Sequence, residues 1–166
     1  MGSRKAIFLA AGLFAAGLSP ALAGDRLSCA ADDAALSASF ELQFNDQDGG
    51  RLEHIRGAID TRQAGVPESL RHLDLTSQML SQYWTDDRTM KIRLLARAYG
   101  DLGMDVVEIA AVLQRQASDA GLYRGRYDLT AFRVPPSARG NAAPQPLASA
   151  TAAIACSPRQ QFALAN

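Results

Sequence analysis

The 166-residue chain has few of the residue types from which enzyme and metal sites are usually built. It contains two histidines, two cysteines and one tryptophan, and neither His54 nor His72 lies in a catalytic motif. The chain has no Gly-x-Ser-x-Gly elbow for a nucleophilic serine, no glycine-rich phosphate loop, no Cys-x-x-Cys and no His-x-x-x-His zinc pair. These absences leave nucleophilic catalysis unsupported, and we expect neither a cofactor nor a metal ion.

A hydrophobic run long enough to span a bilayer is also missing. The apolar stretch at residues 6–18 is too short for a transmembrane helix. It follows Arg4 and Lys5 and precedes Ala21-Leu22-Ala23, which has the small-x-small pattern of a signal peptidase site. We therefore expect residues 1–23 to be a cleaved signal peptide and the mature protein to be periplasmic or secreted.

Excess positive charge is absent from the rest of the chain. Residues 1–23 hold two cations and no acids, so 15 Lys and Arg and 17 Asp and Glu remain, a net charge of −2. A chain with this balance is not expected to bind nucleic acid or an anionic membrane surface.

The two cysteines, Cys29 and Cys156, lie near the two ends of the expected mature chain. An even pair of cysteines in an exported protein is typical of a disulfide. We expect this disulfide to close almost the whole mature chain into one loop.

Alternation of apolar and polar residues predicts the fold class. A period of two, typical of strands with one buried face, occurs at 36–44, 51–61, 92–97, 107–114 and 123–130. The short apolar segment 151–156 adds a sixth expected strand. Because several connections are short, we expect an all-β fold of about six strands with one short helix, arranged as an antiparallel sandwich or flattened barrel.

Matching apolar faces and opposite charges predicts the register of the central strands. In the hairpin that turns near residues 99–102, paired residue numbers should sum to 201. This register sets Ile92 against Ile109 and Arg93 against Glu108. For the following hairpin, sums of 236 and 234 both remain open, and charge pairing favours 234.

The hairpin formed by residues 36–61 has its own expected register and an acidic turn. A sum of 95 or 97 matches the apolar faces and places Glu41 against His54 or Arg56. The turn at residues 45–50 is rich in acids, but Gly50 stands where a calcium loop needs an oxygen ligand. We therefore interpret the turn as solvated.

Three segments outside these strands complete the expected organisation. Residues 67–70 are expected to begin a helical turn, and 75–84 to form a short amphipathic helix, with a strand at 80–85 as the alternative. Residues 135–150, rich in proline and alanine, are expected to form a mobile loop, and 158–166 a frayed tail. Residues 24–134 and 151–157 would then make a single β-rich domain.

Two groups of residues are candidates for binding. Tyr123, Gly125 and Tyr127 share one strand face, and a glycine within a strand often marks close approach by another group. That group could be a ligand, or neighbouring aromatic residues in the core. Leu95, Val106 and Val112 make the outer face of the central strands too apolar to lie wholly in water. The cover would be the expected helix or a partner protein.

These observations favour an exported, non-catalytic domain that binds an envelope protein or a small apolar ligand. The alternative is a hydrolase or transferase whose site is assembled around His54 or His72 from residues distant in the sequence. The two differ in one structural feature, because an enzyme should gather one of these histidines with carboxylates in a cleft.

The expected export can be tested directly. Protein recovered from the periplasm or medium of an expressing cell should begin at Gly24, because the residues before it carry the features of a cleaved signal peptide. N-terminal sequencing and intact mass measure this. Recovery of the exported protein with residues 1–23 still attached would contradict the prediction.

Overall fold

The computed structural model describes residues 26–45, 50–118, 121–136 and 143–158. The expected signal peptide, most of the acidic turn and the expected tail beyond Pro158 lie outside these ranges. Nine strands form one antiparallel sheet in the order β4-β3-β2-β1-β9-β8-β7-β6-β5. They are β1 (Arg26–Asp32), β2 (Leu36–Asn45), β3 (Arg51–Thr61), β4 (His72–Leu75), β5 (Leu80–Thr85), β6 (Thr89–Gly100), β7 (Gly103–Arg115), β8 (Tyr123–Val134) and β9 (Gln145–Pro158).

Helical structure in the described ranges is limited to two 3₁₀ turns, η2 (Glu68–Leu70) and η3 (Ser77–Met79). The first of these confirms the helical turn expected after Pro67. Neither turn, nor any other described helix, has the length and apolar character needed to cross a membrane.

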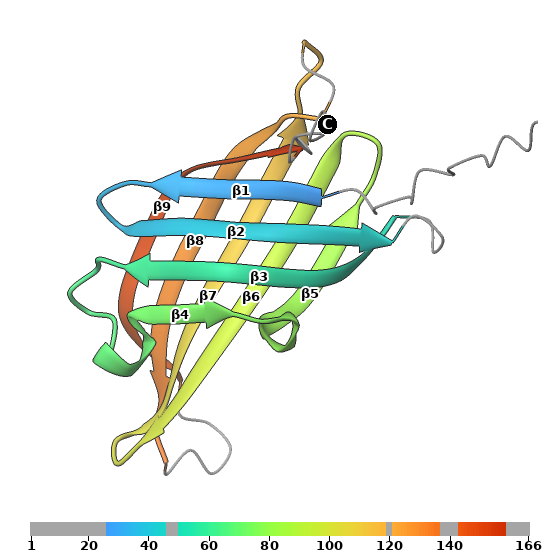
Figure 1. Cartoon of the computed structure of the whole chain (residues 1–166). Coiled ribbons are helices and arrows are strands. Elements are labelled where there is room, and N and C mark those ends of the chain that lie inside the picture. The colour runs from blue at the N-terminus through green and yellow to red at the C-terminus, as the bar shows by residue number, and fades with distance from the viewer. Residues whose placement is uncertain (1–25, 46–49, 119–120, 137–142, 159–166) are drawn as a thin grey trace, which may run out of the picture.

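The sheet has two halves that fold across each other. Strands β1–β4 lie in front of β5–β9 in Figure 1, and the two sets of strands run in different directions. The halves are joined through β1 and β9, where Leu27–Ala30 pair with Ala155–Pro158. Cys29 and Cys156 are directly opposite each other in this pairing and form the expected disulfide, with an S–S distance of 2.04 Å.

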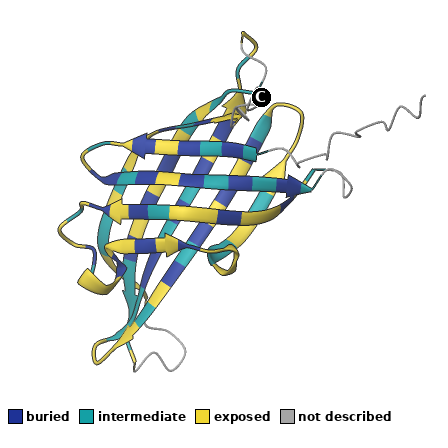
Figure 2. Ribbon diagram, viewed as in Figure 1, coloured by how far each residue is buried: buried dark blue, intermediate teal, exposed yellow. Residues whose placement is uncertain are grey.

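The side chains between the two halves form the hydrophobic core. Alternate residues along the strands are buried, which gives the dark bands of Figure 2 and confirms the period of two found in the sequence. One buried cluster draws on both halves of the sheet. Its largest fully buried side chains are Leu36, Leu42 and Ile59 from one half and Met90, Leu113, Tyr127 and Leu129 from the other.

The all-β class is confirmed, but the expectation of about six strands in a sandwich or flattened barrel is corrected to nine strands in one continuous sheet. All six expected strands are present, and β1, β4 and β5 are additional. Strand β1 was missed because its inner face carries Leu27, Cys29 and Ala31, two of which are small. Strand β4 has four residues, too few to show a period.

The helix expected at residues 75–84 is wrong, and the alternative strand at 80–85 is confirmed as β5. Tyr83, Trp84 and Thr85 favour extended backbone. In this segment the edge of β6 provides backbone hydrogen bonds, and β5 pairs with it from Leu80 to Thr85. Tertiary pairing therefore outweighed a helical spacing of apolar residues.

The register of the β2–β3 hairpin is confirmed. From Leu36 to Gln43 the paired numbers sum to 97, and a shift follows between Gln43 and Phe44. Glu41 lies opposite Arg56, and the Arg56 Nη2 atom is 2.7 Å from Glu41 Oε2.

The register expected for the β6–β7 hairpin is wrong by two residues. Leu94, rather than Ile92, pairs with Ile109, because Gly100 pairs with Gly103 and leaves a turn of two residues. A shift of two preserves which face is buried. Arg93 and Glu108 still form an ion pair, diagonally, with Arg93 Nη2 2.8 Å from Glu108 Oε1.

Two further expectations are corrected: the register between β7 and β8, and the loop at residues 135–150. Paired residues of β7 and β8 sum to 238, so neither 234 nor 236 is right. Strand β9 begins at Gln145, so residues 145–150 belong to the sheet and not to the expected loop. Pro146 fits there because it pairs with Phe132 at a register shift in β8, where a missing N–H is tolerated.

The confirmed faces predict a ranking of two variants. Leu94 is 4% exposed and faces the core, so Leu94→Ala should lower the free energy of unfolding by about 2–5 kcal/mol. Glu108→Ala removes an ion pair with the half-exposed Arg93 and should cost only about 0.2–1 kcal/mol. Urea unfolding with the disulfide intact measures both. Equal losses would show that Glu108 has a role beyond this ion pair.

Candidate functional site

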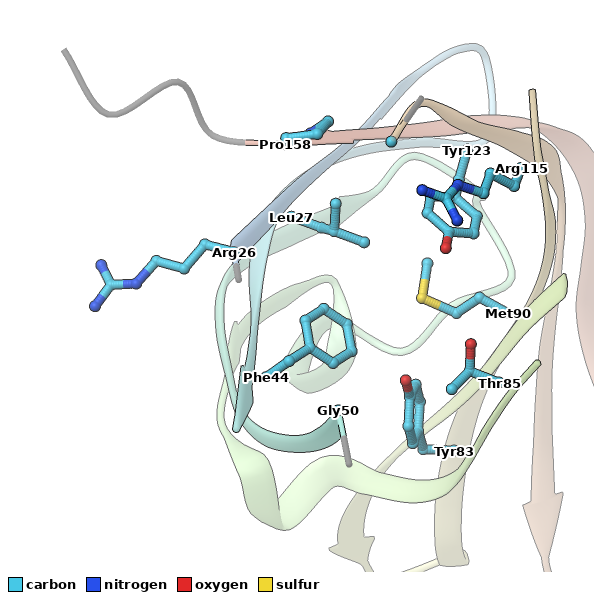
Figure 3. Close-up of a pocket in the computed structure, with 11 residues that line it drawn as sticks. Arg26, Leu27, Phe44, Gly50, Tyr83, Thr85, Met90, Arg115, Tyr123 and Pro158 are labelled. Carbon is cyan, nitrogen blue, oxygen red and sulfur yellow. The ribbon is translucent and has the colours of Figure 1, made fainter. Parts of the chain in front are cut away.

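A pocket of about 370 Å3 opens at one end of the molecule, between the two halves of the sheet. Seven of the nine strands or their ends contribute to its wall, and Figure 3 shows the side chains around it. Its volume falls within the range of about 300–1,000 Å3 found for small-molecule sites. The described lining residues are Arg26, Leu27, Phe44, Gly50, Tyr83, Thr85, Met90, Arg115, Gly121, Tyr123 and Pro158.

The inner wall of this pocket is apolar and aromatic. Leu27 and Met90 are the first inward residues of β1 and β6, Phe44 is the last of β2, and all three are buried. The rings of Phe44 and Tyr83 face each other across the two halves, with centroids 6.0 Å apart and planes inclined by 48°. Burial raises the pKa of the Tyr83 phenol above 10, so this group is a neutral hydrogen-bonding group at pH 7.

One cation accompanies the apolar wall. Arg115 pairs with Tyr123 in the β7–β8 ladder, so the two side chains project on the same side of the sheet. Figure 3 shows the Arg115 guanidinium beside the Tyr123 ring, whereas Arg26 extends away from the pocket. No acidic side chain is among the described lining residues. The pocket therefore combines apolar side chains and phenol groups with positive charge at its rim.

The structure places the three residues of the expected ligand face in different environments. Tyr123 lines the pocket. Gly125 lies against the neighbouring strand, where an added Cβ would be 2.7 Å from the Leu113 Cα and closer still to the Val112 carbonyl oxygen. Tyr127 is fully buried. The close approach at Gly125 is thus made by the backbone of β7.

Tyr127 connects the two halves of the sheet through a hydrogen bond. Its hydroxyl donates to Asp33 Oδ2 at 2.7 Å, and the amide nitrogens of Ala35 and Leu36 donate to Asp33 Oδ1. Burial disfavours the charged carboxylate, but these hydrogen bonds and the nearby Arg62 outweigh it and hold the pKa of Asp33 below 3.8. Burial and the same bond raise the pKa of Tyr127 well above 10. This contact is structural and lies away from the pocket wall.

The three residues of the expected partner surface also differ in their exposure to solvent. Val106 is 2% exposed, Leu95 is half-buried and Val112 is 45% exposed. The helix that we expected to cover this face does not exist, because residues 80–85 form β5 in the same sheet. Val112 lies instead in a row across the outer face, between Lys91 of β6 and Arg126 of β8.

The two histidines lie on β3 and β4, outside the 370 Å3 pocket. His54 is exposed opposite Gln43. His72 Nδ1 is 2.6 Å from Asp60 Oδ1, and its Nε2 is 3.4 Å from Asp74 Oδ1. The hydrogen bond to Asp60, followed by the charges of both aspartates, raises the pKa of His72 above 6.5. Sequence reasoning missed this cluster because the pairing of Asp60 with His72 depends on the unforeseen β4.

Metal binding has no visible basis in the described ranges, where no group of three or more His, Cys, Asp or Glu side chains is placed to hold an ion. Among the pocket residues, only Tyr123 had been singled out from the sequence. A weaker sequence signal for the pocket is a position close to the end of a strand. This signal is shared by Phe44, Tyr83, Met90 and Arg115. Only the crossing of the two halves shows that these ends meet.

Comparison with known proteins adds no assignment. No protein-family model matches the chain, and no curated protein or solved structure is significantly similar to it. The interpretation of the site therefore depends on its own geometry.

The contact between Tyr127 and Asp33 gives a prediction with a defined pH dependence. Tyr127→Phe removes a hydrogen bond to a charged group and should lower the free energy of unfolding by about 1.5–3 kcal/mol at pH 7. Because the pKa of Asp33 is depressed on folding, its ionised form stabilises the fold above about pH 4, and this contribution is lost as the pH falls through the lowered pKa. The cost of Tyr127→Phe should therefore shrink in acid.

Urea unfolding at pH 7 and pH 3 measures this difference. Tyr99→Phe is the matched control, because Tyr99 is 83% exposed and its hydroxyl should contribute nothing measurable. A cost for Tyr127→Phe that stayed constant between the two pH values would contradict the charged character of the bond.

Proposed function

We propose that this protein is an exported, non-catalytic binding protein that holds a small ligand in the pocket between the two halves of its sheet. The ligand has an apolar, ring-containing body and an acidic group. The observation that carries the proposal is the combination of apolar and aromatic side chains with Arg115, the one cation among the described lining residues that lies toward the pocket.

The chemistry of the wall supports this ligand class. Apolar ligand surface placed against Leu27, Phe44 and Met90 is removed from water, at a gain of about 25 cal/mol per Å2. An acidic group beside Arg115 replaces water with a charge-assisted hydrogen bond, and guanidinium groups suit carboxylate and sulfonate oxygens. The phenols of Tyr83 and Tyr123 add neutral hydrogen-bonding groups that orient the ligand.

Export is supported by the buried disulfide. Cys29 and Cys156 are almost completely inaccessible and directly paired. Disulfides of this structural kind persist in oxidising compartments such as the periplasm or the extracellular space.

The binding site is tested with two fluorescent probes that share one apolar body. We expect 8-anilinonaphthalene-1-sulfonate to bind saturably at one site, and Arg115→Gln to weaken this binding about tenfold, the effect of losing one charge-assisted hydrogen bond. N-Phenyl-1-naphthylamine lacks the sulfonate, so its affinity should be nearly the same for both proteins.

The matched control is Arg126→Gln, which removes an exposed arginine from the outer face of β8. It should leave the affinity for both probes unchanged. Equal weakening of both probes by Arg115→Gln, or of the anionic probe by both arginine variants, would contradict a pocket with one recognising cation.

The alternative function, a hydrolase or transferase, has one observation in its favour, which is the placement of His72 between Asp60 and Asp74. All three side chains are more than half exposed, so the cluster lies on the surface at the edge of the sheet. Under our proposal, His54→Ala and His72→Ala leave probe binding unchanged. Loss of a biological activity in either variant, with the fold retained, would favour the enzyme.

A further inference from the structure

The two edges of the sheet differ in their protection against pairing with another strand. Strand β4 has four residues, carries His72 and Asp74 with their ion pairs, and adjoins η2 and η3. Strand β5 has six residues, and the segment from Thr76 to Thr85 contains no charged residue and no proline. Natural proteins usually protect edge strands with charges, prolines or very short length. Strand β5 has neither charges nor proline, although a register shift shortens its regular part to four residues.

The open edge of β5 is accessible. It pairs with β6 on one side, and no described strand pairs with its other side. Figure 1 shows β5 at the outer margin of its half of the sheet. A register shift between Leu80 and Gln82 confines the regular part to Gln82–Thr85. Trp84 is 44% exposed on the outer face, where Lys91 Nζ lies 5.1 Å from its ring centroid.

We propose that β5 pairs with β5 of a second copy of this chain, antiparallel and about a twofold axis through Tyr83. In this arrangement each Tyr83 lies opposite the other, and Gln82 of each copy lies opposite Trp84 of its mate. Directly opposed residues of antiparallel strands project to the same face, and this register keeps Gln82 and Trp84 on the outer face. Two sheets of nine strands would join into one.

The charge distribution favours a second copy over a foreign strand. A neutral strand offers no charge with which to select a charged partner, and pairing with its own copy opposes no like charges. In this register Lys91 lies in one row with Arg93 of the second copy, because Trp84 pairs with Lys91 and Gln82 pairs with Arg93. These two cations would be three strand spacings apart, about 14 Å, where their repulsion is largely screened. The side of Trp84 away from Lys91 would then be covered by the uncharged side-chain amide of Gln82 from the second copy.

The contact would be small. A single pair of short strands buries less than the roughly 1,200 Å2 of a standard stable interface, so the dimer should be weak and reversible. Association is therefore expected between about 1 μM and about 500 μM protein, the affinity range of such interfaces.

The single tryptophan of the chain makes this association measurable in the unmodified protein. As concentration rises, sedimentation should shift from monomer to dimer. Over the same range, Trp84 emission should move to shorter wavelength and its quenching by acrylamide should fall about twofold. A protein that remains monomeric throughout overturns the proposal and leaves this edge to a strand of a different protein.

A cysteine placed on the proposed axis tests the register. Both native cysteines are in the disulfide, so Tyr83→Cys introduces one thiol that should crosslink two copies under mild oxidation. Val112→Cys is the matched control, because it lies on the exposed outer face of an interior strand. We expect Cys at position 83 to crosslink at least tenfold faster. Equal rates, or dimers of the unmodified protein without crosslinking at position 83, would overturn the proposal.

Discussion

The pairing of the first strand with the last holds this structure together. Among the strands that the structure describes, the half formed by β1–β4 is joined to the half formed by β5–β9 through the pairing of Leu27–Ala30 with Ala155–Pro158. The Cys29–Cys156 bond lies inside this short junction and closes a sequence separation of 127 residues. In the chain-entropy model such a closure contributes about 5 kcal/mol. Without the junction, the core between the halves would rest on side-chain packing and on the contact of Tyr127 with Asp33.

The same junction determines where the pocket forms. Leu27 and Pro158 are its outermost pair, and both line the pocket. The two halves run in different directions, and at the pocket the rings of Phe44 and Tyr83 make a contact between them. The site is therefore the place where the core ends, rather than a feature of one loop or motif. This explains why its residues are scattered over the sequence from Arg26 to Pro158.

Features that depend on the residue pattern of one segment could be predicted from the sequence, whereas features that depend on turns and on distant strands could not. The alternation of residues assigned the buried faces of five strands correctly, and the cysteine count identified the disulfide. For β2 and β3 the sequence left two registers open, and the one that pairs Glu41 with Arg56 is observed. The register of β6 and β7 was not predicted correctly, because it depends on a two-residue turn. A shift of two residues leaves the buried face of each strand unchanged, so the apolar pattern does not detect it. The strand β5 was only the alternative to a helix, because its hydrogen bonds come from β6, whose position no local pattern reveals.

The candidate site was less predictable than the fold. Tyr123 was identified, but for the wrong reason, since the adjacent Gly125 accommodates the carbonyl group of Val112 and not a ligand. Arg115 looked like an ordinary charged residue at the end of a strand. Its significance comes from lining the same pocket as Phe44, which belongs to the other half of the sheet. This relation is absent from every local window of the sequence.

The position of the β1–β9 junction also constrains the order in which the protein folds. The hairpins β2–β3, β6–β7 and β7–β8 join residues close in the chain, so their loop-closure entropy is small. The junction joins the first described residues to the last, so it can form only after the C-terminal strand has been synthesised. Topologies with such distant contacts fold slowly. Until that step is complete, the apolar faces of both halves are exposed together, and this is the period in which the nascent chain is most vulnerable to aggregation.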